Sequence, residues 1–87
     1  MWEAIEAFLA EHDPGAKPVP YLCLSYTDSH VWREAFGSVA YGFVPFRGEQ
    51  ALRGYETKHG DDERVDVADV EFQVEAALSL ARRIARL

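Results

Sequence analysis

Two short polar segments of the sequence contain residue types that bind metals or substrates. One is the run Lys-His-Gly-Asp-Asp-Glu-Arg at 58–64, in which a single imidazole, His59, stands beside a glycine and three acids. A neutral imidazole is a good zinc ligand, and Gly60 allows the backbone to approach a metal or substrate closely. Spacing alone leaves a second reading open, because a single loop histidine is more often a solvated surface residue.

The other polar segment is Thr27-Asp28-Ser29-His30, between an apolar run and a short helical pattern. In a parallel α/β sheet, the ligand crevice lies where strands end and helices begin. Backbone N–H groups at a helix start also favour anions. These four residues are therefore candidates for contact with a ligand. The alternative is that Asp28 and Ser29 only cap the helix.

Three helices are expected around these segments. Residues 2–11 have apolar residues at a helical spacing and are followed by a Pro-Gly stop. Residues 30–36 form a short helix that ends at Gly37. The last helix begins after Asp66, with Asp69 in a variant of the capping box. Its apolar residues recur from Val67 to Ile84 on one face of the helix.

Two strands are expected between the helices. Residues 21–26 and 39–44 are short and mostly apolar without alternation, which is typical of strands buried on both faces. Two such strands joined by a helix predict a parallel βαβ unit. The predicted fold class is therefore α/β: one α-β-α-β-α domain over residues 1–87, with a two-stranded parallel βαβ core and a long loop at 46–64.

The two polar segments, with Gly-Phe-Val-Pro-Phe at 42–46 between them, resemble the C-terminal part of one zinc hydrolase family. That family contains aminoacylases, glutamate carboxypeptidases, acetylornithine deacetylases and succinyl-diaminopimelate desuccinylases. The likeness runs from about Val19 to the C-terminus. It implies a zinc-ligand role for His59 and a substrate pocket lined by Thr27, Asp28, Ser29 and His30. His30 stands where the family often has an arginine that receives a substrate carboxylate, so carboxylate recognition is expected to be weakened or changed here.

The resemblance also implies what the chain lacks. Such enzymes are several times longer and hold two zinc ions with a His-x-Asp motif, a bridging Asp, a Glu-Glu pair and a further acid, before the final histidine. Before His59, this chain has neither a His-x-Asp motif nor a Glu-Glu pair. The first Glu of that pair is the family's general base, so no catalytic residue is assigned here.

The resemblance therefore predicts a truncated or split zinc-dependent peptidase or amidohydrolase-like protein. Its family reaction is hydrolysis of an amide bond next to a carboxylate-bearing group. The chain alone is expected to be inactive and to bind no zinc tightly. Two alternatives stay open: a non-catalytic module that oligomerises or binds a partner, and a dimer that assembles a metal site from His59 and acids of both chains.

Composition limits the partners and the location. The net charge of −6 over 87 residues argues against nucleic-acid binding and against an anionic membrane surface. No apolar run approaches the roughly 20 residues that span a bilayer. The single Cys23 and the absence of a secretory signal favour a cytoplasmic location. An uncovered edge of apolar strands predicts a symmetric homodimer that buries Trp2, or association with a complementary N-terminal half.

Overall fold

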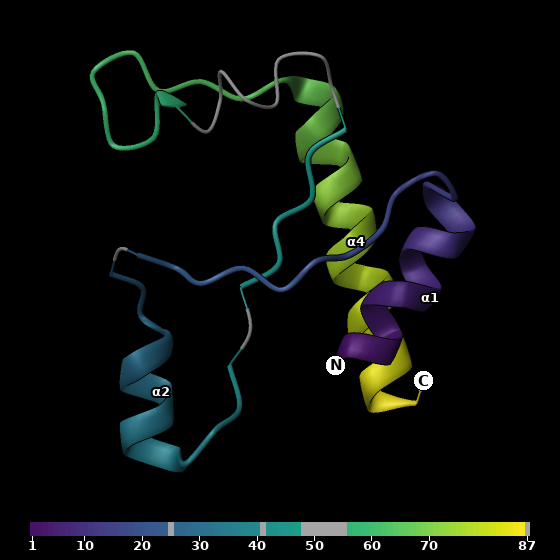
Figure 1. Cartoon of the computed structure of the whole chain (residues 1–87), viewed down its shortest axis with the longest axis horizontal. Coiled ribbons are helices and arrows are strands. Elements are labelled where there is room, and N and C mark those ends of the chain that lie inside the picture. Colours follow the sequence, from purple (N-terminus) through teal and green to yellow (C-terminus); the bar gives the residue numbers. More distant parts are fainter. Residues whose placement is uncertain (25, 41, 48–55, 87) are drawn as a thin grey trace. The chain divides into compact units, whose positions relative to one another are not determined.

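The computed structural model of the chain describes residues 1–24, 26–40, 42–47 and 56–86. The helices with described bounds are α1 (Trp2–His12), α2 (Ser29–Phe36) and α4 (Val67–Ala85), shown in Figure 1. The chain divides into two compact units, Met1–Phe43 and Val44–Leu87, and each is described by itself. No described helix is long and apolar enough to cross a membrane.

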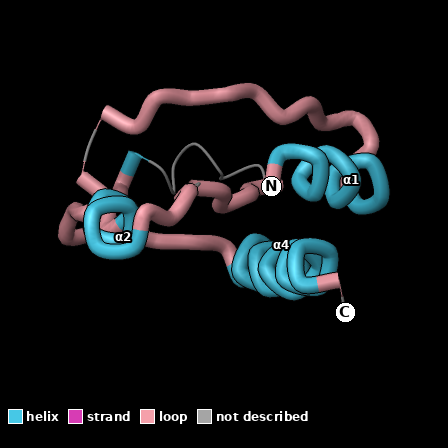
Figure 2. The backbone as a smooth tube through the Cα atoms, turned by 90° about the horizontal axis from the view of Figure 1, so that it is seen from below, coloured by secondary structure: helices cyan, strands magenta, loops and turns pink. Residues whose placement is uncertain are grey.

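The α/β prediction is wrong for the part of the chain that the structure describes. Figure 2 shows helices and loops there, and no strand. In the expected strands at 21–26 and 39–44, Leu22, Leu24 and Val39 are 76%, 84% and 81% exposed. Ser25 and Tyr41 lie outside the described residues, as do residues 48–55 of the expected loop. A strand exists only by pairing with another strand, so apolar, β-favouring residues do not by themselves form a sheet.

Helix α1 confirms the first helical pattern and is one residue longer than expected. Its buried residues are Ile5, Phe8 and Leu9, which lie three and four positions apart and so share one face. Phe8 is fully buried. The helix ends at Asp13, whose backbone N–H donates to the Leu9 carbonyl oxygen at 2.8 Å.

Helix α2 confirms the short helix and its glycine stop. It begins at Ser29 with Asp28 as the N-cap residue. Gly37 adopts the left-handed conformation, with φ of 65°, and its N–H donates to the Arg33 carbonyl oxygen at 2.9 Å. A residue without a Cβ adopts this conformation at little cost, which explains the stop. None of the residues of α2 is buried.

Helix α4 begins where the sequence predicts but buries a different face. Asp66 is the extended N-cap residue, although its side chain makes no capping hydrogen bond. The buried residues are Asp69, Phe72 and Ala76. Val67 and Val74, on the apolar face of the sequence pattern, are 75% and 55% exposed. The apolar face that the sequence pattern shows is therefore not the face that α4 buries.

A segment of the second unit explains this choice of face. The backbone N–H of Arg47 donates to Asp69 Oδ1 at 2.9 Å, and Gln73 Nε2 donates to the Pro45 carbonyl oxygen at 3.2 Å. The Arg47 guanidinium lies over the Phe72 ring, 4.3 Å from its centroid. Residues 45–47 thus cover the Asp69–Phe72 side of α4. Asp69, which the sequence places in a variant of the capping box, accepts the hydrogen bond from Arg47 here.

Candidate functional site

The loop that contains His59 is closed by hydrogen bonds between its own residues. The Gly60 N–H donates to the Thr57 carbonyl oxygen at 2.9 Å, and the Arg64 N–H donates to Thr57 Oγ1 at 3.3 Å. Between them, the Glu63 N–H donates to the Gly60 carbonyl oxygen at 3.3 Å. Thr57 therefore joins both ends of the loop, and the loop is a local unit.

His59 has an unusual backbone conformation within this loop. Its φ is 64°, in the left-handed region that few non-glycine residues occupy. Its N–H donates to Glu63 Oε2 at 3.2 Å, so a side chain four residues later fixes the turn. His59 itself is exposed. The sequence singles out His59, and it also suggests that Glu63 or Arg64 orients the loop, which this hydrogen bond supports for Glu63. The role of Thr57 in closing the loop was not predicted.

Gly60 is required by a close approach inside the loop. A Cβ at this position would lie 3.1 Å from the Thr57 carbonyl oxygen. The glycine was expected to let the backbone approach a metal or substrate. The close approach that the structure shows is instead to the loop's own backbone.

Two of the loop's charged side chains contact each other. The Arg64 guanidinium forms an ion pair with the Asp62 carboxylate, and its Nε donates to the Asp62 carbonyl oxygen at 3.3 Å. Both side chains are exposed, at 59% and 82%, so the pair contributes about 0–1 kcal/mol. Glu63 accepts a hydrogen bond from the His59 backbone. Two of the loop's three acids, Asp62 and Glu63, therefore contact other residues of the same loop.

A zinc ion requires more ligands than this loop supplies. Structural and catalytic zinc sites have three or four protein ligands in close tetrahedral geometry. Among the described residues, no group of three or more His, Cys, Asp or Glu side chains is placed to hold a metal ion. These residues therefore do not fit a zinc site by themselves, and His59 is at most one ligand of such a site.

The second candidate segment forms a polar turn at the start of α2. Thr27 Oγ1 accepts the Ser29 N–H at 3.1 Å, and the Asp28 carbonyl oxygen accepts the Val31 N–H at 3.0 Å. Asp28 is the N-cap residue, but its side chain makes no capping hydrogen bond. Thr27 was expected only to contact substrate. In the structure its Oγ1 is the side-chain oxygen that accepts a backbone N–H at the start of α2. The Asp28 carboxylate is exposed.

The imidazole of His30 is oriented by the same turn. Its Nδ1 lies 2.8 Å from the Thr27 carbonyl oxygen, and the Tyr26 ring meets it edge-on at 5.6 Å between centroids. A carbonyl oxygen can only accept, so Nδ1 holds the proton and a neutral ring presents Nε2 as an acceptor. His30 in this form supplies no positive charge, unlike the arginine that it replaces in the resemblance.

The two candidate groups lie in different units of the chain. Thr27, Asp28, Ser29 and His30 are brought together at the start of α2, in the unit Met1–Phe43, whereas His59 belongs to the unit Val44–Leu87. Each group is organised by hydrogen bonds between residues close in sequence, so each is defined within its own unit.

Comparison with known proteins identified no relative. No protein-family model matches the chain, and neither a curated protein nor a solved structure matches it.

Proposed function

We propose that this chain is the C-terminal piece of a zinc-dependent peptidase or amidohydrolase-like protein and is inactive alone. In that role it contributes His59 as one ligand to a metal centre that other segments complete. The reaction of the complete protein would be hydrolysis of an amide bond next to a carboxylate-bearing group. The proposal is supported by the order and spacing of the two polar segments, which resemble those of the zinc hydrolase family.

One observation carries the proposal. The loop fixes the His59 backbone through Glu63 and closes at Thr57, yet the described residues place no set of co-ligands around its imidazole. A solvated surface histidine needs no fixed backbone, whereas a histidine that shares a metal with ligands from another chain must be positioned before they bind. No step of hydrolysis is assigned to this chain, because it has no identified general base.

The polar turn supports a substrate-binding role in the same assembly. Thr27 orders the start of α2 and orients His30, while the carboxylate of Asp28 is left exposed. We assign Thr27, Asp28, Ser29 and His30 to contact with substrate. With Nδ1 bonded to Thr27, His30 would accept a hydrogen bond through Nε2, and only its protonated form would attract a carboxylate.

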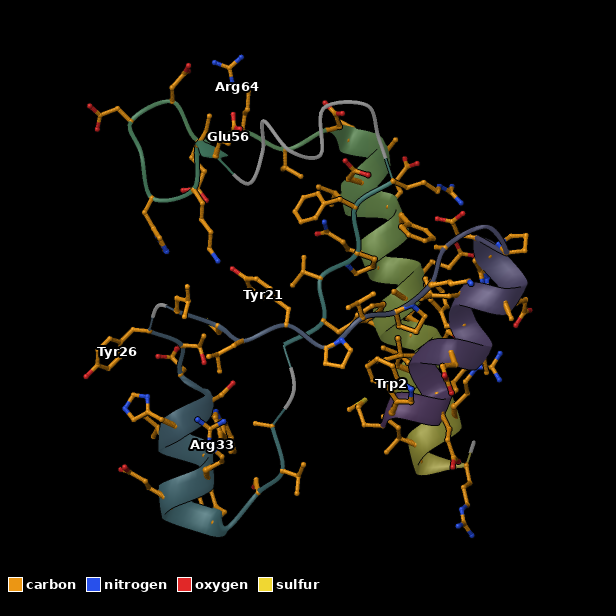
Figure 3. All side chains as sticks on the ribbon, in the orientation of Figure 1. Trp2, Tyr21, Tyr26, Arg33, Glu56 and Arg64 are labelled. Carbon is orange, nitrogen blue, oxygen red and sulfur yellow. The ribbon has the colours of Figure 1, made fainter. Side chains whose placement is uncertain are left out.

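Exposed apolar side chains support the need for a partner. Tyr21 and Tyr26 project from the segment between α1 and α2 and are 74% and 90% exposed (Figure 3). Leu22 and Leu24, between them, are 76% and 84% exposed. Large apolar side chains exposed within one short segment are typical of a surface that another chain covers. The partner would be a complementary N-terminal half or a second copy of this chain, in the cytoplasm, where the lone Cys23 stays reduced.

The test begins with DNA sequence upstream of the Met1 codon. A reading frame encoding a Glu-Glu pair and a His-x-Asp motif should be co-expressed with this chain, and zinc in the purified complex measured by elemental analysis. We expect His59→Ala to lower the zinc content and His12→Ala, the matched control, to leave it unchanged. If the zinc content of the complex is the same with His59→Ala as with the unaltered chain, His59 is not a zinc ligand.

A second candidate function is a non-catalytic module that oligomerises or binds a partner. The exposure of Leu22 and Leu24 favours it independently of any metal. It becomes the better reading if no complementary half is encoded and the chain binds no zinc. Zinc titration of the isolated chain also tests the assembled dimer site: one tight zinc per dimer, lost in His59→Ala, would establish that site instead.

A further inference from the structure

We draw no further inference here: the strongest candidate, the exposed apolar face of α4 that contains Val67, Val70 and Val74, carries no proposal because nothing in the structure shows what covers it.

Discussion

Asp69 Oδ1 accepts a hydrogen bond from the backbone N–H of Arg47 at 2.9 Å, although Asp69 is only 2% exposed. A carboxylate is costly to bury unless its oxygens have hydrogen-bond donors, and a residue 22 positions earlier in the chain supplies one here. With the Gln73–Pro45 hydrogen bond, this contact fixes residues 45–47 along α4. The same contact determines which face of α4 is left exposed.

Removing the Asp69 carboxylate should destabilise the second unit. In Asp69→Ala, the Arg47 N–H loses its acceptor, and we expect the free energy of unfolding to fall by about 1–3 kcal/mol. Asp69→Asn keeps one acceptor oxygen and should cost less. Urea unfolding followed by circular dichroism measures both. Asp61→Ala, an exposed acid, is the control and should change stability by less than about 0.5 kcal/mol; equal losses in both would exclude the proposed role of Asp69.

A Cβ at Gly37 should weaken the end of α2. Gly37 has φ of 65°, and left-handed backbone costs an alanine about 1 kcal/mol. Gly37→Ala should therefore lower the free energy of unfolding by about that amount. Gly15→Ala is the control, because the space around Gly15 is open and its φ is not positive. If Gly37→Ala and Gly15→Ala lower the free energy of unfolding by the same amount, then alanine causes no backbone strain at position 37.

Phe8 should be the most sensitive position of α1. Its side chain is fully buried, and truncation to alanine removes apolar contacts and leaves a cavity. We expect Phe8→Ala to cost about 3–5 kcal/mol, a large part of the roughly 5–15 kcal/mol that stabilises a small protein. Val39→Ala, at 81% exposure, should cost little. Thermal unfolding compares the two, and a small effect at Phe8 would mean that its surroundings collapse to fill the cavity.

Substitutions at His59 should differ in how well they tolerate its left-handed backbone conformation. His59→Gly accepts a φ of 64° without strain, whereas a β-branched valine is strongly disfavoured there. We expect His59→Val to loosen the loop, so that the amides of Gly60 and Arg64 exchange with solvent faster, while His59→Gly preserves their protection. Amide exchange measured by nuclear magnetic resonance gives the answer. Equal protection in the two variants would show that the left-handed turn does not close the loop.

Both candidate groups were proposed from sequence, but most of the hydrogen bonds that organise them could not be predicted from it. His59 and the run Thr27–His30 stand out by residue type and spacing. That Thr27 orients His30, and that Glu63 fixes His59, depends on hydrogen bonds that residue type alone does not specify. The full ligand set of a zinc site cannot be predicted from the sequence, because zinc ligands converge from several segments of the fold.

The sequence by itself determined the helices, and the tertiary structure decided which residues of α1 and α4 are buried. Each turn of a helix satisfies its hydrogen bonds within four residues, so the pattern at 2–11, the Gly37 stop and the Asp66 start predicted α1, α2 and α4. A strand and a buried face both require contact with distant residues. The apolar residues at 21–24 are therefore exposed where a strand was expected, and α4 packs its Phe72 side against residues 45–47 while Val67 and Val74 face outward.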